Sequence, residues 1–147
     1  MAPPIRLDVL WSDTYNETPF CPIMTTILLV GAGGFLGSLF RYFVGTWVHG
    51  LFGNSFPYGT LAVNVVGCLL IGFLGGLADV RELLVPHVRA IVLVGFLGGF
   101  TTFSSFGYET TALFRDGQSW AALANIALQL LLGLGAAWLG YNLSRLL

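Results

Sequence analysis

The sequence predicts an all-α integral membrane protein with four transmembrane helices, of which the third is broken near its middle. Of the 147 residues, 56% are hydrophobic and only 9% are charged, whereas about a quarter of the residues in an ordinary soluble domain are charged. The mean hydropathy of the chain is +0.83. Four apolar stretches each reach the roughly 20 residues that cross about 30 Å of hydrocarbon, and the third contains the unusual sequence GGFTTFSSF.

Charge and cysteine content exclude other classes of protein. With a net charge of -1 and no lysine, the chain has no basic surface for phosphate backbones, so we expect no nucleic acid partner. Cys21 and Cys68 lack the spacing of metal ligands. The sequence shows no arrangement of a nucleophile, a general base or a catalytic metal, which predicts that the protein is not an enzyme.

The first 23 residues differ in kind from the rest. Four prolines and three acidic residues interrupt each short apolar run in this segment, and it lacks the continuous hydrophobic core of a signal peptide. We expect residues 1–23 to be a disordered extension or the product of an upstream start codon. Met24 then begins the four-span domain, residues 24–147.

The predicted spans follow one another with short connections. Proline, glycine and charged residues fill these connections. Trp47, Tyr58, Trp120 and Tyr141 lie near the span ends, where aromatic belts form. The predicted spans are residues 25–48, 60–78, 88–114 and 120–143.

Four spans place both termini on one side of the membrane. Arg81, Arg89 and Arg145 lie on that side, and Arg115 and Arg41 lie toward the other. A bias of three arginines against two is too small to fix the orientation of the chain. We therefore expect the chain to insert in both directions.

Glycine is abundant, with 20 residues in the chain, and many glycines lie four residues from another small residue. Such pairs let helix backbones approach closely in lipid. Tight helix packing explains them, and since four short helices have little interior, so many contact faces also indicate an oligomer. The pairs are Gly33 with Gly37, Gly34 with Ser38, Gly72 with Gly76, Gly95 with Gly99, and Gly133 with Ala137.

Polar side chains within the spans are candidate functional residues, because burying them in a bilayer is costly. Arg41 either extends to the lipid headgroups or places a cation at the mouth of an aqueous path, where it attracts an anion. Asn64 offers amide hydrogen bonds, either to another helix or to an ion. Asn125 and Gln129 lie one turn apart in the fourth span, and Glu109 follows GGFTTFSSF at a position where we expect a water-filled vestibule.

The stretch GGFTTFSSF, residues 98–106, combines features that predict a helix break. Glycines weaken a helix, and threonine and serine hydroxyls bond to nearby carbonyls. Non-helical backbone at membrane depth persists only where it is buried in protein, lines water or coordinates an ion. We expect the freed carbonyls of Gly98 and Thr101 to form a cation site, as broken helices do in transporters.

Beyond the break, the sequence predicts a path for an anion. Phe103 and Phe106 share a helix face, and Ser104 and Ser105 present hydroxyl donors beside them. Because the edge of an aromatic ring is positive, these rings together with hydroxyl and amide donors attract an anion weakly, and no carboxylate lies in the stretch to repel one. A phenylalanine packing patch, with its hydroxyls bonded back to the helix, is the alternative explanation.

In this combination the sequence resembles the small four-helix fluoride channels of the CrcB or Fluc family, over about residues 25–145. The resemblance is carried by GSLFRY, GTLAVNVVG and GGFTTFSSF. The family motif commonly has TTFSTF, and Ser105 here replaces the last threonine but keeps the hydroxyl. The resemblance implies an antiparallel, dual-topology homodimer in a bacterial inner membrane, with two fluoride pores and one structural sodium ion (Na+) at the dimer centre.

The resemblance also implies roles for single residues. The backbone carbonyls of Gly98 and Thr101 would hold the sodium. Asn125 and Gln129 are assigned to a polar track from their helix position alone. The implied pore residues are Asn64, Phe103, Phe106, Ser104, Ser105 and Arg41.

The function that the resemblance implies is a fluoride-selective channel for passive export of fluoride from the cytoplasm, which protects the cell against fluoride toxicity. Two other classes remain as alternatives. A small dual-topology multidrug exporter needs a membrane-embedded carboxylate to exchange protons for cationic drugs, and the first span has none. A non-transporting membrane subunit would need neither a helix break nor a polar track.

Overall fold

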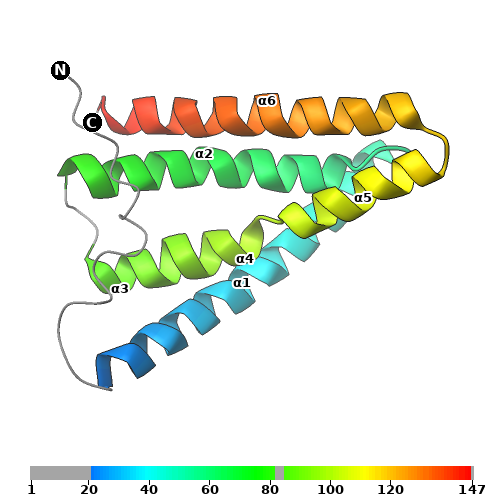
Figure 1. Cartoon of the computed structure of the whole chain (residues 1–147). Helices are drawn as coiled ribbons and strands as arrows, with labels where there is room; N and C mark the ends of the chain where they lie inside the picture. The colour runs from blue at the N-terminus through cyan, green and yellow to red at the C-terminus, as the bar shows by residue number, and fades with distance from the viewer. Residues whose placement is uncertain (1–20, 82–84, 147) are drawn as a thin grey trace.

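The structure is a computed structural model that describes residues 21–81 and 85–146 (Figure 1). Throughout these residues every regular element is a helix, as the sequence predicts. Three long helices form the first, second and fourth spans, and four shorter pieces form the third. The long helices are α1 (Cys21–Phe52), α2 (Tyr58–Arg81) and α6 (Ser119–Ser144); the pieces are α3 (Pro86–Val88), η2 (Arg89–Leu97), α4 (Gly98–Phe100) and α5 (Phe103–Arg115).

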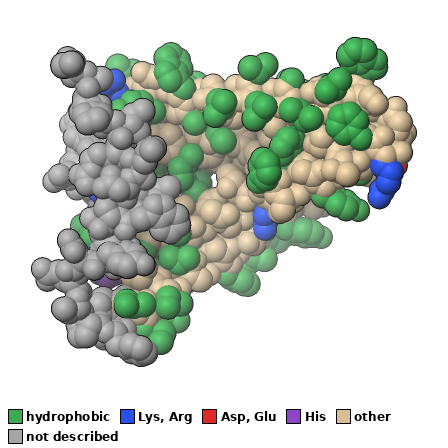
Figure 2. All heavy atoms as spheres, viewed as in Figure 1, with side chains coloured by type: hydrophobic (Ala, Val, Ile, Leu, Met, Phe, Trp, Pro, Cys, Tyr) green, Lys and Arg blue, Asp and Glu red, His purple; other side chains and the backbone are tan. Residues whose placement is uncertain are grey.

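The described residues contain four helical segments long and apolar enough to cross a membrane, Ile23–Phe52, Tyr58–Ala78, Pro86–Arg115 and Ser119–Ser144. They confirm the four predicted spans with slightly wider limits. Large apolar side chains cover the outside of the bundle, and Figure 2 shows few charged groups among them. Trp120 is 85% exposed and Leu131 is 73% exposed. An apolar exterior of this kind fits a chain whose outer surface faces lipid.

The limits of the first span differ from the prediction at its N-terminal end. Helix α1 begins at Cys21, three residues before Met24, where we place the start of the four-span domain. Of residues 1–23, for which we expect a disordered extension, residues 21–23 belong to α1 and residues 1–20 lie outside the described part of the chain. Helix α1 ends at Phe52 and is followed by Gly53, whose positive φ of 79° is easily adopted by glycine at a helix end.

Glycines bring α1 directly against the third span. A side-chain carbon added at Gly33 would collide with the Ile91 carbonyl, and one added at Gly37 would collide with the Phe96 carbonyl. Gly99 lies equally close to α1, because a carbon there would be 2.5 Å from the Gly34 oxygen. These positions must lack a side chain for the two backbones to approach as they do.

A second glycine contact joins α2 to α6, which run side by side in Figure 1. The backbone of Ala137 lies against Gly72, and the backbone of Leu69 lies against Gly140. The glycine pairs that we interpret as signs of an oligomer are therefore used, in both helix pairs, for contacts within one chain. Their spacing alone gives no evidence of a second copy.

The third span is broken, as predicted, but the break lies at the threonines and not at the glycines. Gly98 keeps helical backbone angles, with φ -63° and ψ -38°. Thr101 (ψ 157°) and Thr102 (φ -151°, ψ 114°) are extended. Before the break, η2 is a π-helix, in which each backbone bond spans five residues instead of four. Nothing in the sequence analysis predicts this wider winding.

Candidate functional site

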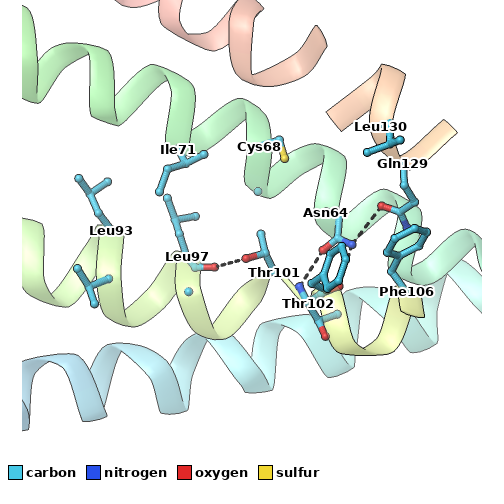
Figure 3. Close-up of a pocket in the computed structure, with 14 residues that line it drawn as sticks. Asn64, Cys68, Ile71, Leu93, Leu97, Thr101, Thr102, Phe106, Gln129 and Leu130 are labelled. Atoms are coloured by element: carbon cyan, nitrogen blue, oxygen red, sulfur yellow. Dashed lines mark hydrogen bonds between the residues drawn. The ribbon is translucent and has the colours of Figure 1, made fainter. Parts of the chain in front are cut away.

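The break is held by the side chain of Asn64 on α2. The Thr102 backbone N–H donates to Asn64 Oδ1 over 2.8 Å, and Asn64 Nδ2 donates to the Thr102 carbonyl over 3.0 Å (Figure 3). Backbone groups that leave a helix inside a membrane need other partners. One side-chain amide both accepts from the Thr102 N–H and donates to the Thr102 carbonyl.

The fourth span joins this arrangement through Gln129. Asn64 Nδ2 also donates to Gln129 Oε1 over 3.1 Å, so one amide connects α2, the break and α6. Gln129 Nε2 is buried and has no hydrogen-bond partner among the described residues. The structure therefore brings together Asn64 and Gln129, which lie 65 residues apart in the sequence.

An open groove with a volume of about 490 Å³ lies beside this amide pair (Figure 3). Asn64 and Gln129 line it together with the two predicted pore rings. The Phe103 and Phe106 rings meet edge to face, with centroids 5.4 Å apart and planes at 65°, a favoured geometry for an aromatic pair. Phe103 is 80% exposed in the single chain, so the groove is not closed on this side.

Arg41 and Ser105 lie in a different cavity, of about 170 Å³, between α1, α2 and the start of α5. Arg41 Nη1 is 3.4 Å from the Thr101 carbonyl. The hydroxyl of Thr60 and the ring of His49 also line this cavity, and it contains no carboxylate. Thr102 is the residue that lines both this cavity and the groove. The structure thus divides the predicted pore residues between two sides of the break.

The hydroxyls at the start of α5 form a local cap. Thr102 Oγ1 accepts a hydrogen bond from the Ser105 N–H over 3.2 Å, which satisfies a free donor at the helix N-terminus. The same oxygen lies 3.0 Å from Ser105 Oγ and 3.2 Å from Ser104 Oγ. The Thr102 hydroxyl is therefore within hydrogen-bond distance of both predicted serine hydroxyls.

The carbonyls of Gly98 and Thr101 are among those that lose their α-helical donors at the break. In a continuous helix the Thr102 N–H would donate to Gly98 and the Ser105 N–H would donate to Thr101. Here Asn64 takes the first donor and the Thr102 hydroxyl takes the second. Gly98 and Thr101 are the two residues that we expect to bind a cation. Because hard cations prefer oxygen ligands, the freed carbonyls fit a sodium ion, although the guanidinium of Arg41 already contacts one of them.

Glu109 lies one helix turn beyond this region, in a third cavity of about 330 Å³. Thr60 Oγ1 donates to Glu109 Oε1 over 2.7 Å, while Glu109 Oε2 is buried without a partner among the described residues. Residues of the loop between α1 and α2 line the same cavity. This location fits the vestibule that we expect at Glu109.

Asn125 does not join Gln129 in a common track along α6. Its side chain is fully buried and its Nδ2 donates to Thr110 Oγ1 over 2.9 Å, while Thr110 Oγ1 donates to the Phe106 carbonyl over 2.7 Å. Asn125 thus ties α6 to α5, whereas Gln129 reaches the break. Neither of the two cavities beside the break is lined by Asn125.

The sequence analysis does not single out His49, Thr60 or Thr102. His49 lines both the Arg41 cavity and the Glu109 cavity. A histidine near the end of an apolar span is a signal that could have identified it. Thr102 is part of the quoted stretch, but only the structure shows that its backbone and its hydroxyl have separate partners.

Known proteins and one family model resemble this sequence over most of its length. Proteins named fluoride-specific ion channel FluC, from Sorangium cellulosum, Geotalea daltonii and Pseudomonas fluorescens, are 50%, 41% and 49% identical to it. These alignments cover 79%, 83% and 82% of this chain and 91%, 98% and 97% of the relatives. A family model described as CrcB-like protein, Camphor Resistance (CrcB), matches residues 28–141. Because that match reaches into all four spans and includes the break, the chain belongs to the CrcB family.

Proposed function

We propose that this protein is a fluoride-selective ion channel that lets fluoride leave the cytoplasm passively, and that it is not an enzyme. The relatives bear the name of such a channel. The observation that carries the proposal is the break at Thr101 and Thr102, held by Asn64 and flanked by hydrogen-bond donors and aromatic rings. Neither cavity beside the break is lined by a carboxylate.

The proposed selectivity depends on replacing water around a small, strongly hydrated anion. Arg41 attracts the anion, and the hydroxyls of Ser104 and Ser105 with the ring edges of Phe103 and Phe106 then take the place of water. Asn64 Nδ2 is bonded to Thr102 and Gln129, and Gln129 Nε2, which has no partner among the described residues, completes the set. Chloride is excluded by the width of the path and by poorer donor geometry.

The proposed assembly is an antiparallel homodimer with dual topology. Phe103 is largely exposed beside an open groove, which supports closure of the path by a second copy. The small arginine bias supports insertion in both directions. The Gly98 and Thr101 carbonyls of the two copies would hold one sodium ion, which supplies a fixed positive charge at the dimer centre.

The protein is a multi-pass membrane protein, and we place it in a bacterial inner membrane. All three relatives named above come from bacteria. A passive channel there would let fluoride leave the cell down its electrochemical gradient and so limit its toxicity.

Fluoride efflux from liposomes tests this function. Purified protein is reconstituted into vesicles loaded with potassium fluoride, and release is followed with a fluoride electrode after a potassium ionophore is added. We expect rapid fluoride release, with vesicles loaded with chloride as the selectivity control. Vesicles that retain fluoride as tightly as protein-free vesicles would overturn the proposal and favour a non-transporting subunit, whereas proton-coupled uptake of a cationic drug would favour an exporter.

A further inference from the structure

His49 lies in the wall between two cavities. The cavity of about 330 Å³ contains Glu109, and the cavity of about 170 Å³ contains Arg41 and reaches the break at Thr102. His49 lines both of them. Thr60 completes the wall, because it lines the smaller cavity and donates to Glu109 Oε1 over 2.7 Å. The direct way from the Glu109 cavity to the break therefore runs past His49.

Two contacts hold the ring of His49 in this wall. His49 Nδ1 lies 3.5 Å from the Gly53 carbonyl oxygen, and since a carbonyl only accepts hydrogen bonds, we assign the proton of the neutral ring to Nδ1. The ring also packs on Gly59 of α2, where an added side-chain carbon would lie 2.8 Å from His49 Nε2. Nε2 is therefore the atom that takes up the second proton when the ring becomes charged.

The charges around His49 come from α1, α5 and the turn that follows α5. Arg41 of α1 lines the smaller cavity, whereas the residues of α2 that line it are uncharged. Asp116 lies in the turn after α5, and its carboxylate is 3.8 Å from Arg115 Nε. The titratable and charged groups that line the two cavities together with His49 are Arg41, Tyr42, Tyr108, Glu109 and Asp116.

The Glu109 cavity is an unfavourable entrance for an anion while His49 is neutral. Glu109 and Asp116 place two carboxylates there, and among the described residues that line this cavity His49 is the one that can carry a positive charge. Histidine changes its charge between about pH 5 and 8. Because charges that line a cleft act strongly on an approaching ion, protonation of His49 would offset a carboxylate where the anion passes.

We propose that His49 controls the passage of fluoride by its charge. The charged ring lets the anion move from the Glu109 cavity to the Arg41 cavity, and the neutral ring slows this step. Lowering the pH adds a proton to Nε2 and a positive charge to the path, so the channel is faster in acidic than in alkaline solution. This inference rests on the proposed function and adds a residue to it that lies outside the break.

The pH dependence of fluoride efflux tests this role. Wild-type protein, His49→Gln and His87→Gln are reconstituted in parallel, and release is followed with a fluoride electrode at equal internal and external pH between about 5.5 and 8. The chain has two histidines. His87 is the matched control, because it is exposed on α3, at the opposite end of the bundle from the loop between α1 and α2 (Figure 1). Release from protein-free vesicles is subtracted at each pH, since hydrogen fluoride crosses a bilayer without a channel.

We expect efflux through the wild type and through His87→Gln to rise on the order of tenfold from the alkaline to the acidic limit, the lower end of the rate gains that charged clefts give. His49→Gln stays polar but takes up no proton, so its efflux should remain slow at every pH. His49→Lys keeps a positive charge over this range and should remain fast at every pH. The opposite behaviour of the two variants separates the charge of the side chain from its shape.

A pH dependence that persists in His49→Gln would assign the titration to another group and overturn the inference. Wild-type efflux that is equal at every pH would do the same, and in both cases the channel function stands. Where His49→Gln gives no single size-exclusion peak in detergent, His49→Asn replaces it with the same expectation. Wild-type vesicles that release fluoride no faster than protein-free vesicles at any pH overturn the proposed function and the inference with it.

Discussion

Asn64 and Thr102 are joined by two hydrogen bonds that run in opposite directions, 2.8 Å from the Thr102 nitrogen and 3.0 Å to the Thr102 carbonyl oxygen. A side chain of α2 therefore replaces the helical acceptor that the Thr102 N–H gives up at the break. The break depends on a second helix as much as on its own sequence. Its geometry is fixed only when α2 is packed in place.

Removal of this side chain should destabilise the protein. Asn64→Leu leaves the Thr102 N–H without its acceptor and removes a donor from the Thr102 carbonyl, and an unpaired buried group costs about 1–3 kcal/mol. We expect a lower midpoint of thermal unfolding in detergent, measured by the loss of the size-exclusion peak. Asn142→Leu serves as the control, because it loses a single bond within α6. Equal midpoints for the two variants would show that the Asn64 bonds do not hold the break.

The cap at the start of α5 gives a second, smaller effect. Thr102→Val removes the oxygen that accepts from the Ser105 N–H but keeps the shape of the side chain. Loss of such a cap costs about 1 kcal/mol. Thr102→Ser keeps the oxygen and should unfold close to the wild-type temperature. The pair is compared by thermal unfolding, and a valine variant as stable as the serine variant would contradict the cap.

The position of the break shows how far the sequence predicts the site. The polar composition of GGFTTFSSF predicts a break near the middle of the third span, and the structure has one there. The glycines suggested its location, yet Gly98 is helical and Gly99 packs against Gly34. A glycine can loosen the backbone locally, or it can allow close contact with another helix, which depends on tertiary structure. The sequence alone does not distinguish these two uses of glycine.

The amide pair shows a second limit. Asn64 and Gln129 are each recognised as polar residues in apolar spans, because the cost of burying them is visible in the sequence. Their mutual contact at 3.1 Å depends on the rotation of α6 about its own axis. Asn125 and Gln129, one turn apart, were expected to share a track but have different partners. Spacing on one helix cannot determine which neighbouring helix each residue meets.

Contact between α2 and α6 should tolerate no side chain at Gly140. A carbon added there meets the Leu69 carbonyl and lies 2.8 Å from the Phe73 nitrogen, so Gly140→Ala forces the helices apart. We expect reduced yield of folded protein and a lower unfolding temperature. Gly135→Ala, on the same helix, has no atom within 4 Å of the added carbon and should behave like the wild type. Similar behaviour of both alanine variants would contradict the packing.

The ring of Phe106 should be needed for fluoride flux and not for folding. Phe106→Ile removes the ring edge that faces the groove and the contact with Phe103, while the aliphatic side chain fills much of the same volume. We expect fluoride efflux to be abolished and the size-exclusion profile to be unchanged. Phe35→Ile is the control, because Phe35 is 65% exposed on α1 and lines neither cavity beside the break. Wild-type efflux in Phe106→Ile would remove this ring from the path.

Sodium should stabilise the folded protein through backbone oxygens, and Arg41 should oppose it. The Gly98 and Thr101 carbonyls lack their helical donors, and Arg41 Nη1 lies 3.4 Å from the Thr101 oxygen. A ligand that binds only the folded state raises the unfolding temperature, and the effect grows with the logarithm of its concentration once this exceeds Kd. We expect a higher midpoint in sodium chloride than in potassium or N-methylglucamine chloride at equal ionic strength.

Arg41→Gln removes a competing cation from the same oxygen, so the difference between the unfolding midpoints in sodium and potassium should grow in that variant. In Arg41→Lys this difference should remain as in the wild type. Midpoints that are equal in all three salts for every variant would show that these carbonyls bind no sodium.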